Sequence, residues 1–521
     1  MRPSETDSPR IFTLLNGVID PRFQEVEISS SFQIPHFQMI GLPGPEVSEA
    51  KDRIRSAIES SGLEFPKRKI VLNLSPASER KNGTGLDLAM AIAVILETDR
   101  IEGKKRPPVA DRLFAWAELG LSGRLKGVGS PARALAAALL AKADVIFIAE
   151  EDSEIFYHAG RKLFPDTVLP KVRALSNLAE MSNALLPNEW ESADQPNDPR
   201  KYPHLTVATD LPEHSATSDS KLLPLPPALA RLLEIAAAGA HHFLLLGPKG
   251  IGKSLALEWF LALQPELEPE TLRIRAFISE MTGKSDAISF RRVSPQAKPA
   301  ALIGSFSAGR LRPGEFSLAH GGVLLADEFP EWHRDAREAL REPLERKKIT
   351  ITRVEGAYEL PCDFIFAGNG NLCPCGGVPG SPMDSGLPAC RCLPADRARY
   401  FSRLSGPILD RLDLVFTLRS PPDPSIPSRA FSEAKSRVWE TRARLKKNHG
   451  TMPGKMTAGD LEELLTRSPD LRKKLDAIRF TSFRDRHKTL RLSLTLAALH
   501  GREAPGLDDF REARLLRLPF D

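Results

Sequence analysis

The sequence lacks the long apolar stretch that a membrane-spanning helix requires. Its best apolar run, Leu88 to Leu96, falls well short of the roughly 20 residues needed to cross a bilayer. The first residues, Met1 to Arg10, are polar and carry charges of both signs, so they contain no apolar core of a secretory signal. We therefore expect a soluble, cytoplasmic protein with no membrane partner.

Cysteine is scarce, and neither sign of charge dominates. The chain of 521 residues has only 5 cysteines, all between Cys362 and Cys392. A disulfide-stabilised protein would have more of them, spread along the chain, so this cluster indicates a local site. The 72 basic residues nearly balance the 67 acidic ones, which permits an anionic partner without demanding one. An apolar content of 41% excludes wholesale disorder.

The length allows about two to four domains, and the composition suggests where they divide. Short β-like runs alternate with helical stretches in residues 1–185 and again in 228–420, the second region with a mainly parallel sheet. Residues 186–227 are rich in Pro, Asp, Ser and Asn and are the expected linker. Only helical patterns remain in 421–521. The expected fold is α/β multidomain, with a P-loop parallel-sheet core and a helical C-terminal domain. The clearest predicted elements are strands at Lys69–Leu74 and Val145–Ile148 and a buried helix at Leu86–Leu96.

The most specific motif is a phosphate-binding loop. The pattern G-x-x-x-x-G-K-[ST] is met at every position by Gly247-Pro248-Lys249-Gly250-Ile251-Gly252-Lys253-Ser254. An apolar run precedes it and a helical pattern follows, which argues against a chance glycine loop. Backbone N–H groups of such a loop surround phosphate oxygens, aided by the helix N-terminus. Lys253 is expected to reach the β- and γ-phosphates of ATP, and the Ser254 hydroxyl to bind Mg²⁺.

Two further apolar runs end in polar residues that suit the same site. The first, Val323 to Glu328, ends in two carboxylates. Asp327 is expected to hold Mg²⁺, and Glu328 to polarise the attacking water as a general base. An acidic turn after a core strand is the alternative. The second run leads to Asn369 and Asn371, whose amides could bond the γ-phosphate or its water, or could be plain turn residues.

Four cysteines form two C-x-C pairs, Cys373 with Cys375 and Cys390 with Cys392. Four thiolates could close a tetrahedral, structural Zn²⁺ site and so fold a segment rich in Gly and Pro. The C-x-C spacing is tighter than usual for zinc, and four free thiols or a redox pair are the alternatives. Cys362 is expected to be a buried, small apolar residue.

Several segments together resemble the ComM/YifB family, which are AAA+ ATPases of the magnesium-chelatase clade. In the core, the resemblance rests on Leu311–His320, Ala339–Glu345 and Ser405–Asp413. At the N-terminus, three segments look like that family's Lon-protease-like domain: Ile40–Pro43, Arg53–Ile58 and Asn73–Ala77. In the helical tail, two segments look like its lid domain: Ser482–Arg484 and Leu490–Arg491. The resemblance covers nearly the whole chain except the linker, and the cysteine pairs agree with it.

This resemblance implies roles for further residues. Asn371 matches the sensor-1 asparagine better than Asn369 does. Arg411 matches the arginine finger, which would stabilise the transferring phosphoryl group of ATP on a neighbouring subunit. The family's homo-hexamer is therefore expected here. Arg484 is the better sensor-2 candidate and Arg491 the second. Surface salt bridges or exposed helix charges are the alternatives for all three arginines.

The N-terminal domain lacks a clear protease dyad. Lon-type proteolysis needs a serine nucleophile and a lysine base. Where the resemblance would place the serine, this chain has Thr84, and Lys126 is the nearest lysine candidate. We therefore expect this domain to be structural or to face DNA, without proteolytic activity.

The resemblance also implies DNA as the partner, since the family is linked to DNA processing in natural transformation as hexameric branch-migration helicases. The expected activity is ATP-driven translocation on single-stranded or branched DNA. An expected β-hairpin at Ile349–Tyr358 follows Arg346–Lys348, and the helical tail carries a further basic set: Arg442, Arg444, Lys446, Lys447, Lys473 and Lys474. Each could equally be a solvated surface. A chelatase-like ATPase that remodels a protein is the alternative function. A nucleotide-binding scaffold that turns over poorly is a further competing function, and a protease is the weakest alternative.

The chain departs from the family pattern at three places. The family's Pro-His-His segment is replaced in Phe290–Pro295, where both histidines are missing. A Val-x-Gly-Gln stretch before the core is replaced by Ser215–Pro226, which puts the adenine contacts in doubt. Lys249 stands where proline or glycine is commoner. The intact phosphate loop nevertheless argues that ATP hydrolysis is retained.

Overall fold

The computed structural model describes residues 9–15, 20–41, 44–76, 83–104, 110–185, 222–282, 290–307, 310–353, 356–379, 389–418 and 427–517. They form two compact units. The first comprises Met1–Asp210 with Glu268–Ala287 and Phe306–Arg312, and the second comprises the remainder. Within the described ranges, no helix is long and apolar enough to cross a membrane.

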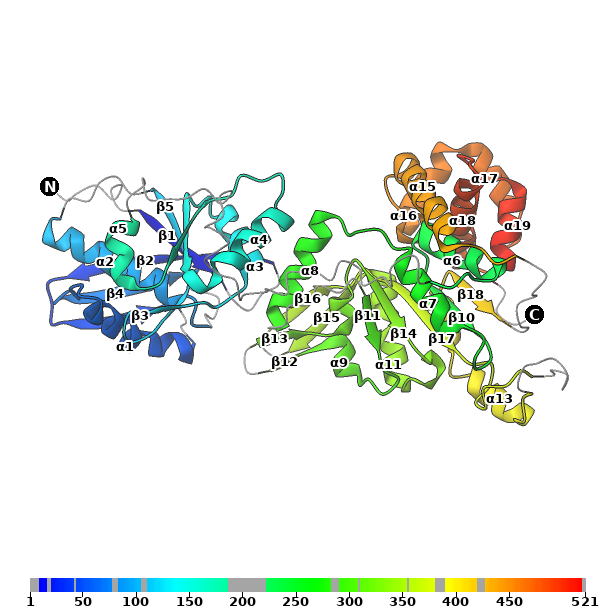
Figure 1. The fold of residues 1–521 in the computed structure, drawn as a ribbon, viewed down its shortest axis with the longest axis horizontal. Helices are drawn as coiled ribbons and strands as arrows, with labels where there is room; N and C mark the ends of the chain where they lie inside the picture. Colours follow the sequence, from blue (N-terminus) through cyan, green and yellow to red (C-terminus); the bar gives the residue numbers. More distant parts are fainter. Residues whose placement is uncertain are drawn as a thin grey trace. The chain divides into compact units, whose positions relative to one another are not determined.

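The first unit is built on a seven-stranded mixed sheet of order β3-β4-β2-β1-β5-β8-β9 (Figure 1). Strand β2 runs antiparallel to both of its neighbours, and the other pairings are parallel. The strands are β1 (Arg10–Leu14), β2 (Phe23–Ser31), β3 (His36–Ile40), β4 (Lys69–Ser75), β5 (Arg112–Trp116), β8 (Val145–Ala149) and β9 (Lys171–Leu175), with a small pair β6 (Glu118–Leu119) and β7 (Leu125–Lys126). The helices are α1 (Pro45–Ser60), α2 (Asp87–Glu102), α3 (Pro131–Leu140), α4 (Ser153–Leu163) and α5 (Met181–Ala184).

Helix α2 is enclosed by the core of this unit. Every residue from Leu88 to Ile95 is at most 3% exposed. A helix that is apolar on all sides must be covered on all sides, and here the sheet and its neighbouring helices do so. The predicted buried helix and the predicted strands at β4 and β8 are therefore confirmed.

Helix α8 (Pro269–Thr282) belongs to the first unit, although it follows the phosphate loop in the sequence. Its Glu280 carboxylate accepts hydrogen bonds from the first turn of α3, from Ala132 N at 2.7 Å and Arg133 N at 3.1 Å. Three of its side chains pack on the core of the same unit: Leu272, Ala276 and Phe277. The sequence predicted that 228–420 would form one domain. The structure differs here because the apolar side of α8 packs in the N-terminal unit.

The second unit contains a five-stranded parallel sheet of order β11-β14-β17-β10-β18. Its strands are β10 (Phe243–Leu246), β11 (Phe290–Val293), β14 (Val323–Ala326), β17 (Ile365–Gly370) and β18 (Leu414–Thr417), with the hairpin β15 (Lys348–Arg353)–β16 (Gly356–Pro361). The strand pair β12 (Gly304–Ser307)–β13 (Arg310–Pro313) lies largely within Phe306–Arg312, which belongs to the first unit. The accompanying helices are α6 (Pro227–Gly239), α7 (Lys253–Ala262), α9 (Pro299–Ile303), α10 (Glu315–Leu318), α11 (Arg334–Ala339), α12 (Arg341–Arg346), α13 (Pro394–Phe401) and α14 (Gly406–Leu409). The predicted parallel-sheet core is confirmed. Because parallel strands end at one edge, the residues that follow β10, β14 and β17 gather there.

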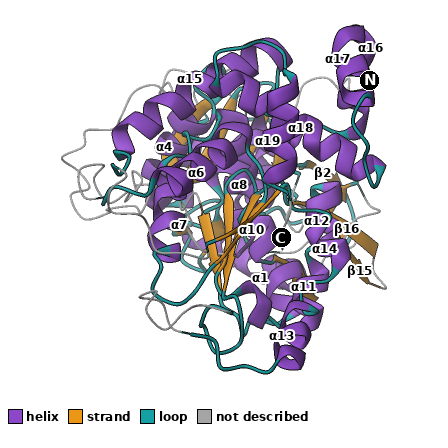
Figure 2. Cartoon of the chain, turned by 90° about the vertical axis from the view of Figure 1, so that its right-hand side faces the viewer, coloured by secondary structure: helices purple, strands orange, loops and turns teal. Residues whose placement is uncertain are grey.

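The C-terminal part of this unit is helical, as predicted (Figure 2). Its helices are α15 (Phe431–His449), α16 (Ala458–Arg467), α17 (Pro469–Asp476), α18 (Phe483–Leu499) and α19 (Leu507–Leu515). Helices α15 and α18 pack on α6, and the Phe431 ring meets the Trp259 ring edge-on at 5.1 Å. Most of the expected linker lies outside the described residues, and only 222–227 can be placed. There, Leu225 forms a single β-bridge with Arg429.

Candidate functional site: a phosphate loop beside a cysteine cluster

The phosphate loop connects the buried strand β10 to helix α7. Gly250 and Gly252 adopt φ angles of +85° and +96°, a left-handed region that favours glycine. Ser254, exposed in the first turn of α7, follows Lys253. The loop therefore has the backbone conformation and the position at the edge of the sheet that phosphate binding requires.

The Lys253 ammonium is already oriented within this loop. Its Nζ donates to Gly247 O at 2.7 Å, to Pro248 O at 2.8 Å and to Asn371 Oδ1 at 3.1 Å. Burial lowers the pKa of Lys253 to about 8, and the negative charge of Glu328 only partly opposes this effect. The lysine is held close to Asn371, the predicted sensor-1 residue, at the end of β17.

Asn369, in β17, bonds to both acidic residues that follow β14. Its Nδ2 donates to Asp327 Oδ1 at 3.0 Å, and its Oδ1 accepts from Glu328 N at 2.8 Å. The side chain is only 5% exposed, so these bonds fix the turn after β14. The sequence indicated Asn369 only as the weaker sensor candidate and did not reveal this positioning contact. Two asparagines at alternate positions of one strand end were the available signal.

Glu328 has a left-handed backbone, with φ at +48°. Such a conformation costs a non-glycine residue on the order of 1 kcal/mol or more and is held by its surroundings. Here the turn is closed by Glu331 N, which donates to Glu328 O at 2.7 Å, and by the Trp332 indole, which donates to Asp327 O at 3.0 Å. The strained residue is the one for which the sequence predicts general-base chemistry.

A second missed residue, Arg292, faces the expected Mg²⁺ ligand. Its Nε lies 3.6 Å from Asp327 Oδ2, and its side chain is 55% exposed. The neighbouring Arg291 points elsewhere and pairs with Glu315 at 2.8 Å. Arg292 lies in the segment where the family's two histidines are missing. A guanidinium at this distance competes with Mg²⁺ for the charge of Asp327, while Asp327 and Ser254 remain suitable oxygen ligands.

Arg411, the predicted arginine finger, and Arg484, the predicted sensor 2, both contact Glu345 and do not contact Lys253. Arg411 Nη2 contacts Glu345 Oε2, and Arg484 Nη2 donates to Glu345 Oε1 at 2.7 Å. Burial alone would raise the pKa of Glu345, but the hydrogen bond and charge of Arg411, with the charge of Arg484, lower it. Arg491, the second sensor-2 candidate, donates to Met456 O.

A buried charge network holds the helical domain on the sheet. Asp413, directly before β18, accepts from His242 N at 3.1 Å and lies 3.8 Å from Lys488 Nζ of α18. Burial opposes its charge, but Lys488, His241 and Arg491 keep the pKa of Asp413 well below its usual value. Burial lowers the pKa of Lys488 to about 7 and that of His242 to about 4.

The four paired cysteines come together as predicted from their spacing. The Sγ atoms of Cys373, Cys375, Cys390 and Cys392 all lie within 4.8 Å of one another. Cys375 and Cys390 are 3.8 Å apart, which is about the sulfur separation of a tetrahedral Zn²⁺ site with Zn–S bonds near 2.3 Å, whereas Cys373 and Cys375 are 3.0 Å apart and would have to separate to bind the ion. The hydrogen bond from Cys373 lowers the pKa of Cys375 to about 6, whereas burial raises that of Cys373 to about 12. The donor set fits a zinc ion, and Cys362 is buried away from the cluster.

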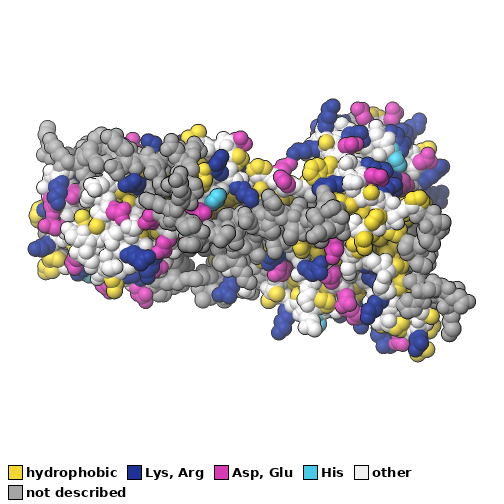
Figure 3. Space-filling model, in the orientation of Figure 1, with side chains coloured by type: hydrophobic (Ala, Val, Ile, Leu, Met, Phe, Trp, Pro, Cys, Tyr) yellow, Lys and Arg dark blue, Asp and Glu magenta, His cyan; other side chains and the backbone are white. Residues whose placement is uncertain are grey.

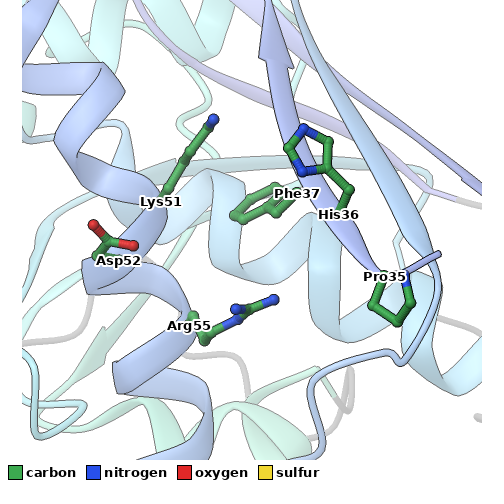
Figure 4. A pocket seen from close by; sticks show the side chains of 6 residues that line it. All are labelled: Pro35, His36, Phe37, Lys51, Asp52 and Arg55. Atoms are coloured by element: carbon green, nitrogen blue, oxygen red, sulfur yellow. The ribbon is translucent and has the colours of Figure 1, made fainter.

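In the first unit, Thr84 and Lys126 both lie near Glu118. Thr84 Oγ1 donates to Glu118 Oε2 at 2.5 Å, and Lys126 Nζ lies 3.9 Å from Glu118 Oε1. No Ser–Lys pair is formed at these positions, and a carboxylate separates the hydroxyl from the ammonium. A small cavity of about 180 Å³ in the same unit is lined by Pro35, His36, Phe37, Lys51, Asp52 and Arg55 from β3 and α1 (Figure 4). It contains neither Thr84 nor Lys126.

Comparison with known proteins identifies the family to which this chain belongs. The family "Magnesium chelatase, subunit ChlI" matches residues 227–424, and "Subunit ChlI of Mg-chelatase" matches residues 25–152. The chain is 32% identical to YifB of Escherichia coli (strain K12), over 80% of this chain and 78% of that protein. It is 31% identical to the protein Rv2897c of Mycobacterium tuberculosis (strain H37Rv), over 98% of both chains. It is 29% identical to the competence protein ComM of Haemophilus influenzae, over 92% and 91% of the two chains.

The matches cover both units, and residues 227–424 include the phosphate loop and the parallel sheet. The chain therefore belongs to the YifB/ComM family of magnesium-chelatase-like AAA+ ATPases.

Proposed function

We propose that the protein is an ATP-hydrolysing motor that assembles as a hexamer and acts on single-stranded or branched DNA. The observation that carries the ATPase part is the arrangement of Lys253, Asn371, Asp327 and Glu328 at the ends of three adjacent strands. Lys253 would hold the β- and γ-phosphates, and Glu328 would take a proton from the attacking water. Mg²⁺, held by Ser254 and Asp327, would supply charge neutralisation on the phosphate oxygens.

The hexamer is proposed because Arg411 needs a neighbour. An arginine finger acts on nucleotide bound to the adjacent subunit, and Arg411 has no bond to the Lys253 cluster among the described residues. Its contact with Glu345 would have to open when it reaches that nucleotide. The similarity to a competence protein supports DNA as the substrate.

The contacts narrow the set of basic residues available to DNA. Lys347 donates to Lys455 O at 2.8 Å, and Arg442 and Arg444 donate to backbone oxygens of Ala237 and Ala498. These three side chains serve the packing of the unit. The remaining exposed candidates are Arg346, Lys348, Lys446, Lys447, Lys473 and Lys474. Basic and acidic side chains are interspersed on the face shown in Figure 3. We propose that each of these residues contacts the phosphate backbone of the DNA locally.

The test is ATP hydrolysis by the purified full chain, alone and with single-stranded, duplex or forked DNA. Glu328→Gln is the control, because it keeps the fold and the nucleotide site but removes the base. Stimulation by DNA that is lost in Glu328→Gln is the expected result. Hydrolysis indifferent to every DNA would instead favour the protein-remodelling alternative. Nucleotide binding with no hydrolysis would contradict the motor and favour a scaffold.

A further inference from the structure

The phosphate loop is hydrogen-bonded to the cysteine cluster. Lys249 N, at the third position of the loop, donates to Gly376 O at 3.0 Å. Gly376 directly follows Cys375, one of the four clustered cysteines. A backbone donor of the nucleotide site is thus fixed by a residue whose place depends on the cluster.

Gly376 is held by a tight turn within the cluster. Its N–H donates to Cys373 O at 3.0 Å, a backbone bond that remains when the Cys373 thiol loses its proton to bind zinc. The φ angle of Gly376 is +77°, which favours glycine at this position. The carbonyl that faces Lys249 is therefore set by the conformation of Cys373–Gly377.

Two other contacts join the end of β17 to the phosphate loop. Gly247 N donates to Gly370 O at 3.1 Å, and Lys253 Nζ reaches Asn371 Oδ1 at 3.1 Å. Gly370 ends β17 and Asn371 directly follows it, so these two contacts lie at the end of the strand. The Lys249–Gly376 contact lies further along the chain, directly after Cys375.

The segment around the cysteines has little other structure to hold it. Among its described residues, the only β pairing is the single bridge between Val378 and Ala389. Short segments of this kind owe their fold to the metal when four thiolates bind it, and they loosen when it is removed. The position of Gly376 should therefore follow the occupancy of the cluster.

We propose that metal binding at Cys373, Cys375, Cys390 and Cys392 positions the phosphate loop for nucleotide through the hydrogen bond from Lys249 N to Gly376 O. Gly376 is then a positioning residue for the nucleotide site. This inference rests on the proposed ATP site. The bond requires a backbone N–H at position 249, which a proline there would lack.

The experiment measures the affinity of full-length protein for a fluorescent ATP analogue, with zinc bound and after removal by a chelator. Zinc content is determined by elemental analysis in each sample. Loss of one hydrogen bond at the loop predicts a dissociation constant about 3-fold to 10-fold weaker without zinc. Lys249→Pro should bind zinc normally, yet its affinity for the ATP analogue should change by less than about 2-fold when zinc is removed.

Two matched variants separate the bond from other effects. Lys249→Ala removes the side-chain charge but keeps the N–H, so its response to zinc should equal that of the wild type. Cys362→Ser changes a buried thiol outside the cluster and should also keep the full response, whereas Cys392→Ser should behave as the zinc-free protein does. Amide hydrogen exchange of residues 247–252 gives a readout independent of affinity, and exchange should quicken when zinc is removed.

The outcomes distinguish this inference from the proposed function. Equal affinity with and without zinc in the wild type, or an unchanged zinc response in Lys249→Pro, would overturn the inference while leaving the ATPase intact. If Lys249→Pro does not fold, Gly376→Ala takes its place, and its zinc-bound form should bind nucleotide as weakly as the zinc-free wild type. A zinc-bound wild type that takes up no nucleotide would refute the proposed ATP site itself.

Discussion

Replacing Asp413 with asparagine tests how the helical domain is held on the ATPase sheet. The Asp413 carboxylate accepts from His242 N at 3.1 Å and lies 3.8 Å from Lys488 Nζ and 3.9 Å from Arg491 Nη1. Asparagine keeps the shape and the acceptor for His242 but removes the charge that faces both cations. Loss of one partner from a buried ion pair costs about 3–5 kcal/mol of stability.

The surroundings of Asp413 put the cost at the lower end of this range. Burial lowers the pKa of Lys488 to about 7, so near neutral pH its ammonium can release a proton at little further cost. Arg491 cannot do so, but its side chain is 19% exposed and keeps some contact with water. We therefore expect Asp413→Asn to lower the free energy of unfolding of the second unit by about 3 kcal/mol.

Urea unfolding measures this loss, and amide hydrogen exchange of α18 shows whether it arises at the contact with the helical domain. Asp410→Asn is the matched control, because Asp410 is exposed three residues earlier and undergoes the same chemical change. If both variants unfold at the same urea concentration, the network around Asp413 contributes nothing and the reasoning is wrong.

Three further results are expected. The pKa of Lys488 is about 7 in the folded protein, below its ordinary value of 10.5, so the folded protein releases this proton at a lower pH than the unfolded chain does. The free energy of unfolding should therefore rise by about 2 kcal/mol from pH 7 to pH 9. Urea titrations of Lys488→Met should show no such rise. Glu345→Gln weakens the ion pairs that Glu345 forms with Arg411 and Arg484. Steady-state ATPase activity should therefore rise by up to about 5-fold, the factor that corresponds to the free energy of an exposed ion pair. A fall in activity would contradict this. Glu280→Ala leaves two N–H groups of α3 without acceptors and should destabilise the first unit by about 1–3 kcal/mol, seen as faster hydrogen exchange in α3 while α18 is unaffected.

Much of the fold followed from local patterns in the sequence. The run Leu88–Ile95 is apolar at every position, which only a fully enclosed helix can bury, and α2 is enclosed. The strands that end at Leu246, Ala326 and Gly370 were visible as apolar runs followed by glycine, acid or amide residues. Their common edge in a parallel sheet brought Lys253, Asp327 and the asparagines together without any further information.

What the sequence could not predict depends on contacts between distant segments. The sequence favoured Asn371 as the sensor-1 residue but gave Asn369 no other role, and only the pairing of β14 with β17 shows that Asn369 bonds to Asp327 and Glu328. Arg411 and Arg484 are far apart in the chain, so their shared acceptor was invisible. The bond from Lys249 N to Gly376 O joins two loops, and no periodicity or motif encodes such a contact.

The placement of α8 determines how the chain can be divided. Because α8 lies after the phosphate loop in the sequence but packs in the N-terminal unit, a cut between residues 185 and 222 does not separate the two units cleanly. A fragment starting at residue 222 would carry Leu272, Ala276 and Phe277 without the surface that covers them, and it would be prone to aggregate. A chain nicked in that interval should instead stay together through α8 until it is denatured. Truncations meant to isolate the sheet with the phosphate loop should therefore keep the N-terminal unit.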